Sequence, residues 1–174
     1  KRNQGVPNIA QKLIKDTERS SLKAQKELFN SYFKLHGDKI ESIYSGVVLT
    51  PNDYAVDHFI PWSFVMNDEL WNLMPMASSL NSSKSNKLPK WDPFFIVFAE
   101  NQFGMYKLIH EKEELHKRFE ACYRDNLHSI WASQELYRPG NTKEEFYNIL
   151  QKNMQPVYDS ARRQGYEIWN YQLL

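Results

Sequence analysis

The chain has a single cysteine, Cys122, among its 174 residues. One cysteine cannot form a disulfide within the chain, and it cannot supply the cysteine-based zinc sites that stabilise many small domains. We therefore expect no structural zinc. The scarcity of cysteine also favours a reducing, cytoplasmic environment.

The chain also has almost no excess of one charge, since the formal net charge at pH 7 is only +1. A chain with so balanced a charge does not attract nucleic acid as a whole, so any basic surface has to be local. No run approaches the roughly 18 apolar residues that span a membrane, and no signal peptide is visible, so we expect no membrane partner. The chain begins with Lys1 rather than methionine, which favours a fragment of a longer protein.

The length favours one domain with three parts. Residues 1–40 and 93–174 are predicted to be helical, because apolar side chains recur in them at helical spacing. Residues 41–92 mix strand, turn and helix signals instead. We therefore expect an α+β fold, in which a small core of strand, loop, strand and helix is embedded in a mainly helical domain.

Four residues predict where helices begin and end. Asn8 is a candidate cap for a first helix, and Gly37 is a candidate stop for the N-terminal helical part. Thr142 and Glu145 have the spacing of a capping box, which predicts a helix start after the breaker sequence RPGN.

The middle part has a distinct order of elements. The apolar and β-branched run at 54–60 predicts a strand that stops at Pro61, because proline cannot continue the pairing. In chain order the prediction is strand character at 43–49, a turn at 50–53, a strand at 54–60, a loop at 62–69, a strand at 70–76, and a helix capped by Ser78 or Ser79 that runs to about Lys87 before Pro89.

The same segment carries side chains suited to phosphodiester hydrolysis. Asp57 and Asn81 offer hard oxygen ligands, which suit Mg²⁺ or Mn²⁺ better than zinc. His58 is a base that can accept a proton from water near neutral pH. Lys84 lies three residues after Asn81, so it shares a helix face with that residue and could hold a phosphate.

Regular strand geometry conflicts with a shared site for Asp57 and His58. Neighbouring side chains of a strand point to opposite faces of the sheet. The two can serve one site only if the strand bends, bulges or ends at this point. Taken alone, the Asp-His pair is also typical of a buried histidine beside turn-forming polar residues.

The wider spacing resembles the core of the HNH, or ββα-metal, nucleases. The pattern consists of the pair Asp57-His58, then Asn72, Asn81 and Lys84. The flanking sequences YSG at 44–46 and NSSKSNKLP at 81–89 are similar to the zinc-free branch found in RNA-guided CRISPR effector nucleases and their stand-alone relatives. The resemblance covers roughly residues 44–90 and favours the nuclease interpretation over the buried-histidine one.

The resemblance implies a role for each motif residue. His58 would be the general base, and Asp57 and Asn81 would bind a single divalent ion, Mg²⁺ or Mn²⁺. Asn72 would brace the loop and help to orient the histidine. Lys84 matches a position near the phosphate.

The implied partner is nucleic acid, with Lys84 and Lys87 as candidate contacts, although a solvated helix end is an equally good explanation of these lysines. DNA is the expected substrate, and RNA stays open. No helix for reading base sequence is evident, so specificity would come from further domains or a partner protein, in defence, restriction or guided cleavage. Two alternatives are a catalytically silent nucleic-acid-binding or scaffold domain with the same fold, and an RNase or nuclease toxin.

Overall fold

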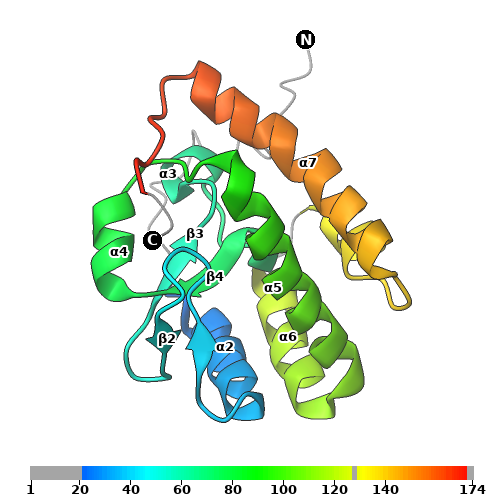
Figure 1. Cartoon of the computed structure of the whole chain (residues 1–174). Coiled ribbons are helices and arrows are strands. Elements are labelled where there is room, and N and C mark those ends of the chain that lie inside the picture. Colours follow the sequence, from blue (N-terminus) through cyan, green and yellow to red (C-terminus); the bar gives the residue numbers. More distant parts are fainter. Residues whose placement is uncertain (1–20, 127–128, 172–174) are drawn as a thin grey trace.

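The computed structural model describes residues 21–126 and 129–171 (Figure 1). Helices dominate it and the strands form two small antiparallel pairs, so the α+β prediction is confirmed. The elements in chain order are α2 (Lys23–Leu35), β1 (Ile40–Glu41), β2 (Val48–Leu49), β3 (Ala55–His58), α3 (Trp62–Val65), the 3₁₀ turn η1 (Leu70–Asn72), β4 (Leu73–Met76), α4 (Ser78–Lys84), α5 (Trp91–Glu111), α6 (Glu113–Asn126), the π-helical turn η2 (Ala132–Leu136) and α7 (Lys143–Arg163). Asn8 lies outside the described residues.

The centre of the fold is the antiparallel pair of β3 and β4, followed directly by α4. Asp57 lies opposite Met74 in this pair, and His58 lies opposite Leu73. The helix α4 begins two residues after β4 and packs back against β3. The predicted order of strand, connection, strand and helix is therefore confirmed, and β1 with β2 forms a separate short hairpin beside it.

Two predictions for residues 62–76 are wrong. Residues 62–69 were expected to be a loop, but they begin with the helical turn α3, because the N–H groups of Phe64 and Val65 both donate to the carbonyl of Pro61, at 2.9 and 3.2 Å. Residues 70–76 were expected to be a strand throughout. They begin as the turn η1 instead, since the N–H of Asn72 bonds to the carbonyl of Glu69 at 3.0 Å.

The helix ends follow the sequence signals at two of three places. α2 ends just before Gly37, which has a φ of 66°, and Thr142 and Glu145 form both bonds of the capping box at the start of α7. The prediction for α4 is wrong at both ends. Its N-cap is Ala77, which makes no side-chain cap bond, and the helix ends at Lys84 because Ser85 adopts a φ of 49°.

The long helices form a frame around this centre. α5 and α6 run side by side, α7 crosses α5, and α2 packs on α6 below the strands (Figure 1). Phe59, the residue after β3, packs on Phe98 of α5, with ring centroids 4.7 Å apart. Because both rings are fully buried, this contact holds the end of β3 against α5.

The segment after α7 returns to the end of α4. The N–H of Leu88 donates to the carbonyl of Glu167 at 2.9 Å, and the N–H of Trp169 donates to the carbonyl of Leu88 at 2.7 Å. α7 itself reaches the same stretch, because the Tyr158 hydroxyl donates to the carbonyl of Pro89 at 2.7 Å. Burial raises the pKa of Tyr158 to about 12, so its hydroxyl stays a donor at neutral pH.

Tyr158→Phe tests this connection. The substitution leaves the buried carbonyl of Pro89 without its donor, so we expect the free energy of unfolding to fall by about 1–2 kcal/mol. Urea denaturation followed by circular dichroism measures the change. Tyr123→Phe on α6 is the matched control, because Tyr123 is half-buried and makes a ring contact with Phe119 that the substitution keeps. Equal stability of the two variants would contradict the prediction.

Candidate active site

A polar pocket of about 340 Å³ opens at the end of β3, between α3 and α4. Its lining consists of Val56, Asp57, His58, Pro61, Trp62, Ser63, Asn81, Ser85 and Asn86. Three of the four residues that the sequence singled out for catalysis or metal binding, namely Asp57, His58 and Asn81, therefore lie on one pocket. Asn72 is not part of its wall.

The strand end explains how Asp57 and His58 share this pocket. β3 stops at His58, and the following residues turn through Pro61 into α3. Of the three solutions that strand geometry allows, a bend, a bulge or an end, the structure shows the third. The alternation of a regular strand no longer applies to the side chain of its last residue.

Asp57 is held by two side chains. Its side chain is only 4% exposed, and Oδ1 accepts a bond from the Lys84 ammonium at 2.9 Å. Oδ2 lies 3.5 Å from the hydroxyl of Tyr44, a long contact. Burial raises the pKa of Tyr44 well above its usual value, and the nearby Asp57 carboxylate raises it further, so Tyr44 stays a neutral donor. A buried carboxylate needs such partners, because a lone buried charge is costly.

Lys84 points inward. Its side chain is 1% exposed, and the ammonium also donates to the carbonyl of His58 at 2.6 Å. The sequence placed Lys84 on the same helix face as Asn81 for contact with a phosphate, and here its charge is directed to Asp57 instead. The phosphate contact stays a prediction, and it requires the pair with Asp57 to open first.

Asn81 lies one turn before Lys84 on α4 and reaches the pocket from the side opposite β3. It is half-buried, and its side-chain amide has no hydrogen-bond partner among the described residues. An amide oxygen and a carboxylate on one polar pocket form a hard donor set, which fits Mg²⁺ because that ion keeps several waters as further ligands. Asp57 and Asn81 therefore fit the predicted metal site by their chemistry.

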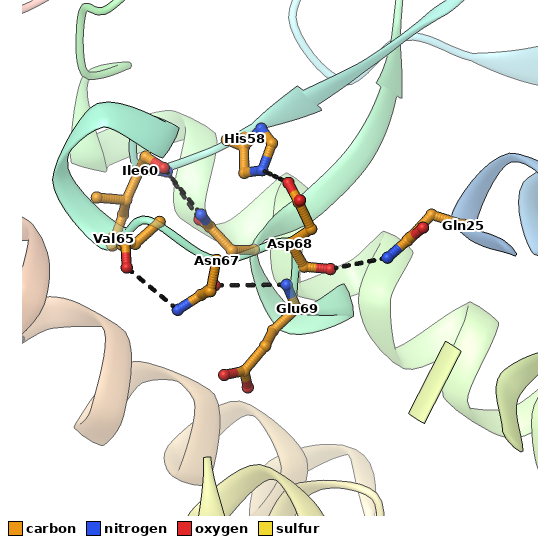
Figure 2. A network of polar contacts seen from close by, with 8 residues as sticks. Gln25, His58, Ile60, Val65, Asn67, Asp68 and Glu69 are labelled. Carbon is orange, nitrogen blue, oxygen red and sulfur yellow. Dashed lines mark hydrogen bonds and ion pairs between the residues drawn. The ribbon is translucent and has the colours of Figure 1, made fainter. Parts of the chain in front are cut away.

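His58 has a partner that the sequence reasoning missed. Its Nε2 lies 2.9 Å from Oδ1 of Asp68, and both side chains are 5% exposed (Figure 2). Asp68 belongs to the segment between α3 and η1, where Asn, Asp and Glu were interpreted only as loop chemistry. The sequence shows only that Asp68 follows His58 by ten residues in the connection to β4, and this spacing does not say that the carboxylate turns to the ring.

Asn72 braces the chain next to His58 and does not touch the ring. Its Oδ1 accepts from the N–H of Ile60 and its Nδ2 donates to the carbonyl of Ile60, both at 2.8 Å. Its own carbonyl accepts from the N–H of Phe59 at 2.8 Å. The amide therefore fixes the turn that follows β3, and the ring of His58 meets Asp68 instead.

Lys87 lies just beyond α4 and does not line the pocket. Its side chain is 45% exposed, and its ammonium is 3.9 Å from the carboxylate of Glu167. Exposed pairs of this length contribute little to stability, so Lys87 is free to exchange partners.

A comparison with known protein families finds a match in the middle of the chain. The sequence pattern of the HNH endonuclease family matches residues 42–90, the stretch that contains β2, β3, β4 and α4. This part of the chain is an HNH domain. The domain indicates a nuclease with a nucleic-acid substrate, and nucleases of this family typically use a divalent metal ion. A search of curated proteins finds no match to the chain.

Two further features of the described residues bear on metal binding and on membranes. Within residues 21–126 and 129–171, no three His, Cys, Asp or Glu side chains cluster as a metal-binding group. In the same part of the chain, no helix is both long and apolar enough to cross a membrane.

Asn72→Ala tests the brace of the HNH domain. It leaves the N–H and the carbonyl of Ile60 buried without partners, and each such group costs about 1–3 kcal/mol. We expect a lower midpoint of thermal unfolding, measured by calorimetry. The control is Asn101→Ala, because the Asn101 amide bonds only within α5 on an exposed face. An unchanged midpoint for Asn72→Ala would show that other contacts hold the turn.

Proposed function

We propose that this protein is a metal-dependent endonuclease that hydrolyses phosphodiester bonds of DNA. The observation that supports this most is the meeting of Asp57, His58 and Asn81 on one polar pocket of the HNH domain. A base, a carboxylate and an amide oxygen at a single opening are the groups that one-metal hydrolysis of a phosphodiester needs.

Asp57 and Asn81 are the proposed ligands of a single Mg²⁺, which Mn²⁺ could replace. A divalent ion at this place would offset the negative charge that develops on the phosphate during hydrolysis. The protein side of the site supplies its own counter-charge in Lys84. Since Asp57 has lone pairs beyond the one that faces Lys84, the carboxylate can serve both cations.

His58 is the proposed general base. Its imidazole takes a proton from a water molecule, and the water oxygen forms a bond to phosphorus. The bond between phosphorus and the leaving oxygen then breaks, and that oxygen receives a proton from solvent. Asp68 contacts the ring of His58, and Lys84 bonds its carbonyl. Asn72 bonds Ile60, two residues further along the chain. The base is therefore held in place before substrate arrives.

The surroundings of the pocket favour contact with a sugar-phosphate backbone over reading of bases. Ser63, Asn86 and the nearby Lys87 present hydroxyl, amide and ammonium groups, which suit phosphate oxygens. Specificity would then come from further domains or a partner protein. Roles in defence, restriction or guided cleavage all fit such a nuclease.

His58→Ala tests the reaction class. We expect cleavage of supercoiled plasmid DNA to require Mg²⁺ or Mn²⁺, to stop with EDTA, and to fall by about 10²–10⁴-fold in His58→Ala, since the base is lost. His116→Ala on α6 is the matched control, because His116 is surface-exposed, outside the pocket lining, and its contacts are with Glu120 and the ring of His110.

Three outcomes would contradict parts of this proposal. Near-normal turnover of His58→Ala would remove the base assignment. Digestion of RNA in place of DNA would change the substrate. Binding of plasmid without cleavage under any metal condition would favour a silent nucleic-acid-binding domain.

Asn81→Ala tests the ligand assignment. The Asn81 amide has no partner to lose among the described residues, so the fold should tolerate the change. We expect the affinity for Mn²⁺, measured by isothermal titration calorimetry without nucleic acid, to fall by at least about tenfold. Asn101→Ala again serves as the control. Equal Mn²⁺ affinity of Asn81→Ala and wild type would place the ion elsewhere.

A further inference from the structure

We propose that Asp68 is the positioning residue of the nuclease site: it accepts a hydrogen bond from Nε2–H of His58 and thereby leaves Nδ1 as the nitrogen that takes the proton from water. This inference rests on the proposed function of His58 as general base. It assigns a role to a residue outside the motif pattern of Asp57, His58, Asn72 and Asn81.

The contact between His58 and Asp68 is short and protected. Oδ1 of Asp68 lies 2.9 Å from Nε2, and both side chains are almost fully buried. An ionised carboxylate has no hydrogen to donate and can only accept. In a pair with ionised Asp68, Nε2 therefore carries the proton. In neutral imidazole one nitrogen is a donor and the other an acceptor, which leaves Nδ1 as the basic nitrogen.

Nδ1 is available for this task. His58 lines the polar pocket, and Nδ1 has no hydrogen-bond partner among the described residues. Figure 2 shows the two ring nitrogens on different sides, with Nε2 turned to Asp68 and the other nitrogen turned away from it. A water in the pocket can therefore meet an acceptor nitrogen whose tautomer is already set.

Asp68 is itself fixed from outside the HNH domain. Its carbonyl accepts a bond from Nε2 of Gln25 at 3.1 Å, and Gln25 belongs to α2 and is fully buried (Figure 2). Met66, two residues earlier, adopts a φ of 51°, which turns the chain sharply after α3. Non-glycine residues pay a cost for this conformation, so it persists only where the surroundings enforce it.

Glu69 anchors the same segment from the other side. Its carboxylate accepts from Nε1 of Trp71 at 2.7 Å and from the hydroxyl of Ser129 at 3.0 Å. Ser129 lies in the C-terminal helical part, far from Asp68 in sequence. The carboxylate of Asp68 is thus presented to His58 by a loop that is held from α2 and from the region before η2.

The general chemistry of such a pair is to hold the ring in one tautomer and one orientation. Replacing the carboxylate by an amide in an Asp-His pair keeps the shape but allows the wrong tautomer, because the amide has donor as well as acceptor groups. The loss then falls on the chemical step, since the pair does not touch the substrate. Binding of nucleic acid stays as it was.

The experiment compares the wild type with Asp68→Asn, Asp68→Glu and the control Asp53→Asn. Asp53 is an exposed carboxylate in the turn before β3, so it matches the charge change without the contact. The first readout is the ¹⁵N spectrum of the His58 ring, in which the shifts of Nδ1 and Nε2 show which nitrogen carries the proton. The second is the single-turnover cleavage rate of supercoiled plasmid DNA with Mg²⁺, measured against protein concentration.

We expect the wild-type spectrum to show the proton on Nε2, and Asp68→Asn to show a mixture of tautomers or the proton on Nδ1. The maximal cleavage rate of Asp68→Asn should fall by about 10²–10⁴-fold, with the half-saturating concentration within about twofold of the wild type. Asp68→Glu should recover part of the rate, because it restores a carboxylate. Asp53→Asn should match the wild type.

A wild-type proton on Nδ1 would overturn the proposal whatever the variants do. A full cleavage rate in Asp68→Asn would overturn it too, as would a lower rate with an unchanged tautomer, which would mean a packing role alone. If Asp68→Asn fails to fold, Asp68→Glu and the wild-type spectrum decide. If the wild type does not cut at all, the proposed nuclease function fails, and the ring spectrum still tests the His58–Asp68 contact separately.

Discussion

The buried ion pair between Lys84 and Asp57 is the contact on which the geometry of the site depends. Both side chains are almost fully removed from water, and a buried charge is tolerated only when a partner and further hydrogen bonds satisfy it. The pair joins α4 to β3 across 27 positions of the chain. Because Asn81 lies one turn before Lys84, the same contact sets the distance between the two proposed metal ligands.

The polar groups around this pair come from several elements of the fold. The Lys84 ammonium also bonds the carbonyl of His58, so the end of β3 is tied to α4 at the proposed base. Tyr44 approaches the other oxygen of Asp57 from the β1–β2 hairpin, and its ring packs edge-on against Phe94 of α5. The HNH segment supplies the proposed reacting groups, and the surrounding helices help to hold these groups in place.

The core order and the meeting of Asp57, His58 and Asn81 on one pocket could be predicted because they depend on local signals. Strand character, the stop at Pro61 and the spacing of Asp57, His58 and Asn81 are all visible within about thirty residues of sequence. Helix caps were predictable where a side chain makes the cap, as at Thr142, and not at α4, where Ala77 leaves the cap to the backbone.

The direction of Lys84 and the role of Asp68 could not be predicted in this way. Helical spacing places Lys84 near Asn81, but it does not say whether the long side chain turns to solvent or to a buried carboxylate. Asp68 depends on a turn with positive φ at Met66 and on Gln25, which is 43 residues away. Contacts at such separations follow from tertiary packing, and one sequence carries no direct record of it.

The return of the chain after α7 has a consequence for any attempt to transfer the HNH domain into another protein. Trp169 packs edge-on against Tyr44, with ring centroids 5.4 Å apart, and its Nε1 donates to the hydroxyl of Ser83 on α4 at 3.3 Å. Trp169 thus contacts both Tyr44, which approaches Asp57, and the helix α4, which carries Asn81. The 42–90 segment therefore does not contain all the supports of the proposed site. A fusion or chimera that omits residues 166–169 would lose the contacts of Trp169 with Tyr44 and Ser83.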